Sequence, residues 1–357
     1  MKDSGFKGGI ILLLALAAAS AHADDKFSII GFGYQDYRQS NANTYEGSDQ
    51  RGSWDNGILA LDFSAKLGDR DNVWVQLESK PSEPTEVTWA YIDHRFNENV
   101  SARIGRIKLP YGLYNEYIDN KALQLSVILP SAYSFRADMV HDAYKGIGVD
   151  WTAGSLFTQV YGGNVYTPVS NADITDTFHD RRLIGTRITW NAPYEGLHFM
   201  FSGWDSQTED DSNTTATPPL GQIGKEYRAM WSVEYVTDQL DIKSEHNHHG
   251  TPTTSAGPGT STNAWYVQGG YKIGLWTPYM RYDSFTGDQS IPSDPSSYQR
   301  DWVLGVNYKV NEYVNARVED HVIHGYGLPV AASYMDPTAG PGKVNWNMMA
   351  AEINFTF

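Results

Sequence analysis

The stretch Lys225–Val236, KEYRAMWSVEYV, alternates between two kinds of side chain with a period of two residues. Its two faces are Tyr227, Ala229, Trp231, Val233 and Tyr235 on one side, and Glu226, Arg228, Met230, Ser232 and Glu234 on the other. This period predicts a β-strand, because successive strand side chains point to opposite sides of a sheet. The charged groups of both signs indicate that the second face meets water, since an unpaired buried charge costs several kcal/mol.

The same period recurs along the chain and predicts sixteen strands. Their ranges are 27–38, 54–67, 73–78, 87–96, 100–109, 145–152, 156–164, 182–191, 197–205, 225–236, 239–247, 263–273, 275–285, 300–310, 313–323 and 345–357. Connections of two to five residues alternate with longer polar connections of up to about thirty-five residues. We therefore predict an all-β fold, a 16-stranded antiparallel transmembrane β-barrel with short periplasmic turns and long extracellular loops.

The first 23 residues have the features of a secretory signal peptide. Lys2 and Lys7 precede the apolar run Ile10–Ala19, and Ala21-His22-Ala23 is a small-x-small cleavage site before Asp24. We expect residues 24–357 to form the barrel. Cleavage would take the net charge from −15 to −16, which argues against a nucleic-acid partner. The chain has no cysteine, so an exported fold must be held together without disulfides.

Composition and patterning favour the barrel over a soluble secreted β-sandwich binding protein, which remains an alternative. The chain is rich in Tyr (23), Trp (11) and Gly (33), and many tryptophans fall near predicted strand ends, where membrane headgroups would lie. The face opposite the apolar one carries charged residues on most strands. A water-filled lumen accommodates these charges, whereas a dry sandwich core would not.

Two stretches resemble Gram-negative outer-membrane porins. The final strand ends Ile353-Asn354-Phe355-Thr356-Phe357, and the stretch Arg103–Glu116, RIGRIKLPYGLYNE, resembles the strand that leads into the inward-folded loop of the phosphate-selective porin O/P-like group. The resemblance implies a homotrimeric channel in the cell outer membrane, in contact with lipid and lipopolysaccharide, with the third loop folded into the lumen. This chain departs from that group, because its basic residues are interleaved with acidic ones.

The long third loop, residues 109–144, is the predicted constriction. Arg103 faces the lumen, and a β-bulge at Gly105-Arg106 would turn Arg106 and Lys108 toward the lumen and Ile107 and Leu109 toward lipid. The alternative places Arg106 and Lys108 at the barrel rim. The predicted solute path comprises Arg103, Arg106, Lys108, Tyr111, Tyr114, Glu116, Tyr117, Asp119, Asp138, Arg187, Arg228, Arg281 and Arg317. Opposed charges would create a transverse field across the pore.

Other motifs are weak. His246, His248 and His249 resemble a metal-binding tract, but we interpret them as solvated loop residues and expect neither a metal nor a cofactor. No hydrolase, P-loop or dinucleotide fingerprint is present in the sequence. We predict a passive channel for small hydrophilic solutes or ions and no enzyme activity. An outer-membrane barrel enzyme is the second alternative, and ion selectivity stays open.

Overall fold

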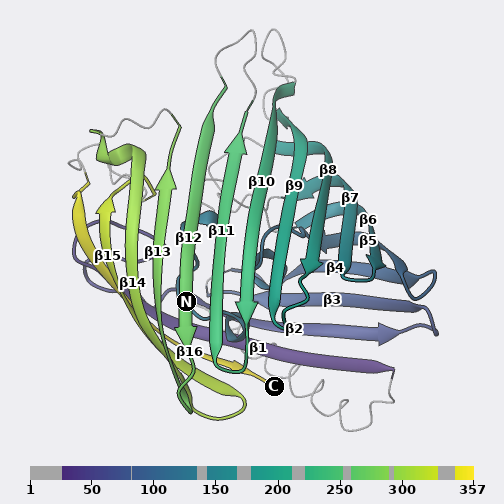
Figure 1. Cartoon of the computed structure of the whole chain (residues 1–357), viewed down its shortest axis with the longest axis horizontal. Coiled ribbons are helices and arrows are strands. Elements are labelled where there is room, and N and C mark those ends of the chain that lie inside the picture. The colour runs from purple at the N-terminus through teal and green to yellow at the C-terminus, as the bar shows by residue number, and fades with distance from the viewer. Residues whose placement is uncertain are drawn as a thin grey trace, which may run out of the picture.

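The computed structural model describes residues 26–81, 83–134, 143–166, 178–210, 222–251, 259–288, 293–328 and 342–357. These residues form sixteen antiparallel strands in one closed barrel, with each strand paired to the next and β1 paired to β16 (Figure 1). The predicted fold class is confirmed. Within the described ranges, no helix is both long and apolar enough to cross a membrane. The predicted signal peptide, residues 1–23, lies outside these ranges.

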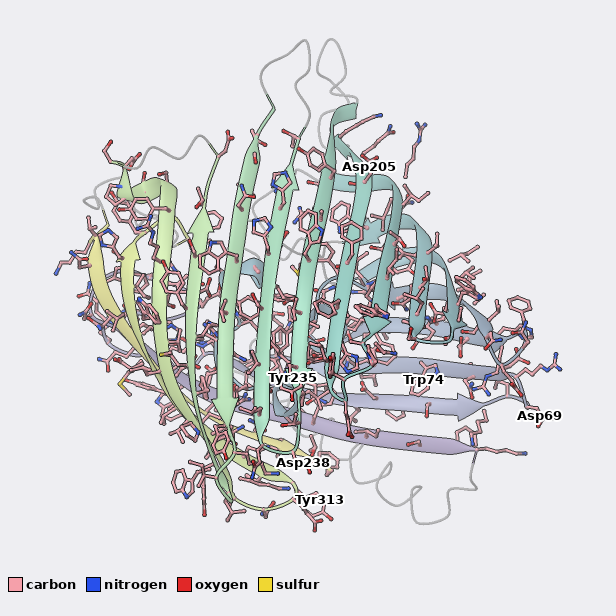
Figure 2. The ribbon with its side chains drawn as sticks, viewed as in Figure 1. Asp69, Trp74, Asp205, Tyr235, Asp238 and Tyr313 are labelled. Atoms are coloured by element: carbon pink, nitrogen blue, oxygen red, sulfur yellow. The ribbon has the colours of Figure 1, made fainter. Side chains whose placement is uncertain are left out.

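The strand bounds follow the predicted period closely. They are β1 (Phe27–Ser40), β2 (Gly57–Lys66), β3 (Asp71–Ser79), β4 (Glu86–Arg95), β5 (Val100–Lys108), β6 (Ala143–Ala153), β7 (Leu156–Tyr166), β8 (Phe178–Asn191), β9 (Leu197–Asp210), β10 (Gln222–Val236), β11 (Leu240–Gly250), β12 (Ser261–Tyr271), β13 (Trp276–Thr286), β14 (Tyr298–Lys309), β15 (Val314–Gly325) and β16 (Asn345–Thr356). The short connections gather at one end, called the short-turn end, and the others at the long-loop end. Figure 2 shows Asp238 and Tyr313 at the short-turn end and Asp205 toward the opposite end.

The two faces of each strand differ as the alternation predicts. On β10, Trp231 is 50% exposed on the outer surface, whereas Arg228 is 2% exposed on the inner side. Neighbouring strands continue the same pattern, because Trp231 pairs with Phe201 on β9 and with His246 on β11. The outer surface is therefore apolar and aromatic, and the inner surface carries polar and charged groups.

Most strands run further toward the long-loop end than predicted, and β8 and β9 show the largest differences. β8 begins at Phe178, β9 ends at Asp210 and β10 begins at Gln222. The additional strand residues include Thr208, Glu209 and Asp210, which are polar and show no alternation with apolar residues. The hydrogen-bonded ladder nevertheless continues through them, with Gln222 paired to Glu209. The alternation of apolar residues therefore predicts where the apolar band on the outer surface ends, whereas the strands themselves continue beyond that band.

Glycines on β1 receive aromatic rings from β16 where the barrel closes. Gly33 pairs with Phe355, and the Gly31 amide donates to the Phe357 carbonyl over 2.8 Å. A Cβ atom on Gly31 would lie 2.1 Å from the Phe357 ring, and one on Gly33 would lie 2.8 Å from the Phe355 ring. At Gly33 the same Cβ would also lie 2.6 Å from the Ile58 carbonyl oxygen, so a side chain there meets backbone, whereas at Gly31 it meets only the exposed Phe357 ring.

Candidate pore constriction

Loop 3 is the name used for residues 109–142, between β5 and β6, and its described part enters the barrel. The described part, residues 109–134, contains three 3-10 turns, η1 (Asn115–Tyr117), η2 (Lys121–Leu123) and η3 (Ser131–Tyr133). β6 starts at Ala143, two residues earlier than predicted. Gly112 has φ +60°, and a Cβ there would lie 2.2 Å from the Tyr133 hydroxyl and 2.4 Å from the Met230 sulfur. Glycine is therefore required where the loop first turns across the barrel.

Three inward-facing carboxylates, the anchor carboxylates Glu245, Asp283 and Glu319, hold loop 3. Glu245 accepts hydrogen bonds from the Leu113 amide at 2.8 Å and from the Tyr133 hydroxyl at 2.5 Å. Glu319 accepts from the amides of residues 127 and 128 at 2.9 and 2.7 Å. Asp283 accepts from the Ser131 amide at 2.8 Å and from its hydroxyl.

The anchor carboxylates accept hydrogen bonds from backbone N–H groups of loop 3 that have no strand partner. A loop inside a barrel has no sheet partner for its N–H groups, and buried N–H groups must be paired. Ionised carboxylates accept such bonds more strongly than neutral groups do. Sequence reasoning missed Glu245, Asp283 and Glu319 as loop contacts. The alternation along β11, β13 and β15 predicts that these side chains face inward. It does not predict which segment of loop 3 each one contacts.

Two of the predicted solute-path arginines also hold the loop. Arg281 donates to the Ser126 hydroxyl at 3.0 Å and to the Ile128 carbonyl at 2.8 Å. Arg317 donates to the carbonyls of Lys121, Gln124 and Ser126 at 2.7, 2.6 and 3.0 Å, and pairs with Glu352. Both side chains are about 1–2% exposed, so the guanidinium groups meet loop backbone rather than open lumen.

A second group of charges joins the other side of loop 3 to the wall. Glu116 pairs with Arg187 on β8 and lies 3.8 Å from Arg103 on β5. Arg103 also pairs with Asp150 on β6 at 2.7 Å. We call Arg103, Glu116, Asp150 and Arg187 the charged cluster. Its side chains are 11–28% exposed, unlike the nearly inaccessible anchors.

A separate ion pair lies close to the start of the loop. Lys108 Nζ is 2.5 Å from Asp119 Oδ2. Both groups were predicted to face one another across the constriction, and the structure brings them together. The charged cluster and this pair place loop carboxylates directly against wall cations. A transverse field at this point would act on any solute that passes.

The predicted tyrosines supply bulk. Tyr111 donates to the Asn247 side chain at 2.7 Å, and Gln268 donates to the Tyr114 hydroxyl at 3.3 Å. Burial raises the pKa of Tyr111 and of Tyr114 well above the ordinary value, so both remain neutral. Tyr117 is partly exposed and meets the Tyr114 ring edge-on at 5.9 Å.

Lys121 is a buried cation within the loop. Its Nζ donates to the Gln124 side chain at 3.1 Å and to the Val127 carbonyl at 3.0 Å. Burial is the largest influence on this amine and lowers its pKa to about 8. Glu352 opposes this shift of the pKa, whereas Arg38 and Arg317 act in the same direction as burial. The loop thus contains a lysine whose charge is only moderately favoured near neutral pH.

Arg106 does not face the lumen, and the predicted bulge at Gly105-Arg106 is wrong. β5 pairs without interruption with both neighbours from residue 101 to residue 106. Arg106 shares a face with Ile104, which is 57% exposed, and donates to the Val87 carbonyl at 2.6 Å. Ile107 and Leu109 were predicted to face lipid, and this is also wrong, because both are buried in the interior hydrophobic cluster.

The remaining predicted residues have separate outcomes. Arg228 is buried on the inner face, 4.8 Å from the Trp204 ring centroid and 3.4 Å from Glu226. Asp138 lies outside the described residues. The three histidines do not form a loop tract, because β11 runs to Gly250. His246 lies against the outward Trp231, whereas His249 contacts the inner Glu226 at 3.1 Å.

Open space remains beside the loop toward the short-turn end. A cavity of about 650 Å³ lies between η2 and the ends of strands β10 to β14. Leu123 lines this cavity and is 57% exposed. Polar groups from the turn Thr237, Asp238 and Gln239 line its opposite side. The loop therefore narrows the barrel without filling it.

No protein-family model matches the chain, and no curated protein matches it. Solved structures do resemble its fold. An anion-selective porin from Comamonas acidovorans superposes with a TM-score of 0.62 at 12% identity, covering 93% of this chain and 99% of that one. OmpF of Salmonella typhi gives 0.61 at 12% identity, with 93% and 97% covered. The trimer form of OmpT, an outer membrane protein of Vibrio cholerae, gives 0.60 at 13% identity, with 93% and 100% covered. The chain therefore has a porin-like fold, and these likenesses lend no support to the phosphate-selective subgroup.

Proposed function

We propose that the protein is an outer-membrane porin, a passive diffusion channel for small hydrophilic solutes or ions. The observation that carries this proposal is loop 3, which crosses the barrel interior on buried anchors and leaves charged groups beside it. A barrel that only anchors an enzyme has no need for such a loop. The charged cluster and the Lys108–Asp119 pair would form the selective part of the path.

The proposal includes the setting of the channel. After cleavage near Ala23, the chain would insert into the outer membrane of a Gram-negative bacterium, in contact with lipid and lipopolysaccharide. We propose a homotrimer, an assembly for which the trimer form of the V. cholerae protein is a precedent in this fold. Chemical cross-linking of the detergent-extracted protein tests the assembly, and a single band at the monomer mass would contradict it.

Acidic residues lie between the basic ones, which argues against a channel specific for phosphate. It favours a channel that admits small hydrophilic solutes of several classes. Glu116 and Asp119 lie directly on the cations that a phosphate would otherwise meet. Binding phosphate there would require displacing these carboxylates. We therefore expect solute size and net charge to govern passage.

Single-channel recording in planar bilayers tests conduction, and the absence of cysteine makes a sharper version possible. Leu123→Cys places one thiol on the exposed tip of η2, inside the barrel. Asp69→Cys places one on the exposed short turn between β2 and β3 (Figure 2). A positively charged methanethiosulfonate reagent should reduce the conductance step of the first variant and leave that of the second unchanged.

Two results would contradict the proposal. A correctly folded barrel, identified by its heat-modifiable migration on a gel, could give no conductance steps. Alternatively, both cysteine variants could respond equally to the reagent, which would place loop 3 away from the conducting path. Wild-type protein treated with the same reagent is the control, and its conductance should not change.

A further inference from the structure

A hollow of about 370 Å³ lies on the outer surface of β13–β16, near the long-loop end. Its outward side chains form two rows set by strand register. Arg300 pairs with His324, which pairs with Asn345, and this is the upper row. Trp302 pairs with Val322, which pairs with Asn347, and this is the lower row. Adjacent members of a row are about 5 Å apart, so each row presents one continuous surface.

Apart from Asn347 in the lower row and Asp320 beneath it, this part of the outer surface is apolar. Trp302 and Val322 are 50% and 53% exposed, and the Tyr282 ring packs on Trp302 with centroids 4.7 Å apart. Leu304, one step further along β14, is 60% exposed. These groups suit acyl chains, and Trp and Tyr are enriched where a membrane changes from hydrocarbon to headgroup. We therefore expect the hollow to lie at that boundary.

The upper row presents hydrogen-bond donors. Asn345 Oδ1 lies 2.8 Å from His324 Nδ1, so the oxygen is engaged and the amide NH₂ is left to donate. The second ring nitrogen of His324 lies 3.0 Å from the Tyr298 hydroxyl. Arg300 stacks over the Tyr298 ring at 5.4 Å, and within the described residues no carboxylate lies at ion-pair distance from it. Arg300 and the Asn345 amide flank His324 in this row, and a guanidinium together with an amide donor suits a phosphate group.

We propose that this hollow binds the phosphorylated headgroup of an outer-leaflet lipid. Arg300, with the Asn345 amide, would hold the phosphate, and Trp302 and Val322 would contact the first acyl carbons. Asp320 also faces outward, one step below Val322, so the negative headgroup is expected in the upper row, away from that carboxylate. The inference rests on the proposed membrane location and not on conduction.

Native mass spectrometry of the detergent-solubilised protein tests the site. The probe is bis-phosphorylated lipid A, compared with the same lipid after dephosphorylation and with inorganic phosphate as a competitor. Arg300→Gln should weaken retention of the first lipid adduct by about tenfold, because charge-assisted hydrogen bonds are lost. Lys309→Gln removes one cation at the short-turn end of the same strand and should leave retention unchanged.

The outcomes separate the alternatives. Equal retention of both lipids, or equal loss in the two variants, would overturn the site. Displacement of the lipid by millimolar inorganic phosphate would point to a simple anion site and also overturn it. A change of oligomeric state in Arg300→Gln would assign the hollow to a second copy of the chain instead. Conductance is recorded in parallel, and its presence or absence bears on the proposed function alone.

Discussion

Loop 3 meets the barrel wall on two sides, and the two contacts differ in accessibility. Toward β11–β16 it rests on Glu245, Asp283, Glu319, Arg281 and Arg317, all nearly inaccessible to solvent. Toward β5–β8 it meets the charged cluster, whose side chains are up to 28% exposed. The same residue types, on the same inward face of similar strands, thus have two roles. Burial converts a lumen charge into a structural anchor, while access to water leaves it free to act on solutes.

The largest expected effect comes from breaking an anchor. Arg317→Met removes donors from the carbonyls of Lys121, Gln124 and Ser126 and leaves Glu352 buried without this partner. We expect the free energy of unfolding to fall by about 3–5 kcal/mol. Urea unfolding of the barrel in lipid vesicles measures it, followed by the change in tryptophan fluorescence.

The matched change on the exposed side is Arg187→Met, in the charged cluster. A partly exposed pair contributes little, so the expected loss is below about 1 kcal/mol. Equal losses in the two variants would remove the distinction between the two contacts. The Arg317 variant should also give noisier single-channel currents, because loop 3 loses three backbone contacts.

The second prediction concerns pH on the anchored side. Burial lowers the pKa of Lys121 to about 8 from an ordinary 10.5. Between these values the unfolded chain holds a proton that the folded chain has released, so stability rises as pH rises. The gain is at most about 3 kcal/mol over the whole interval. Unfolding at pH 8 and at pH 9.5 should show part of this gain.

Lys121→Met provides the control for this effect. The variant should lose the rise between pH 8 and 9.5, whereas contributions from other groups are common to both proteins and cancel in the difference. A rise of the same size in the variant would assign the pH dependence to another group. The comparison would then say nothing about burial of Lys121.

A smaller effect on stability, with a clear effect on selectivity, is expected on the exposed side. Glu116→Gln removes a negative charge that lies against Arg103 and Arg187. Stability should change by less than about 1 kcal/mol. The reversal potential in a salt gradient should shift toward anions, since Arg187 loses this carboxylate and Arg103 keeps only its pair with Asp150. Asp69→Asn, at a short turn, is the control, and an equal shift in that variant would argue against a local field.

The smallest effect is expected at Arg106, which faces outward. Arg106→Gln should leave conductance and reversal potential unchanged, and the stability effect should stay below about 1 kcal/mol near the membrane boundary. Arg103→Gln, three residues earlier and inside the lumen, should shift the reversal potential toward cations. If the two variants shift it equally, the outward placement of Arg106 is incorrect.

The fold was readable from the sequence because one period governs most of it. A strand that separates lipid from water must alternate, so sixteen alternating runs predicted sixteen strands. Loop 3 was readable only as an interruption, and its contacts were not. Glu319 pairs with backbone amides nearly two hundred residues away, a relation that no local pattern encodes.

Arg106 shows a second limit of pattern reasoning. A charge on an apolar face was resolved by assuming a bulge, which would have turned Arg106 inward. The strand kept its register instead, with Gly105 at φ +143° and its backbone close to Ala90 and Tyr91. Outward arginine is tolerated near the membrane boundary, where its cost is small. The unbroken register of β5 with both neighbours, which the sequence alone did not show, decided between the two alternatives.

The two glycines of β1 that contact aromatic rings of β16 affect how the barrel closes. β1 is the first strand made and β16 the last, so their edges remain unpaired until nearly the whole barrel has been synthesised. Gly31 and Gly33 receive the Phe357 and Phe355 rings only in the correct register, because a shift of one residue would turn both rings to the other face. The fit of the two rings over the two glycines therefore favours the correct register when the barrel closes. We expect a side chain at Gly33 to hinder this pairing, because it would meet the Ile58 carbonyl oxygen as well as the Phe355 ring, and unpaired edges of β1 and β16 would be open to pairing with another chain.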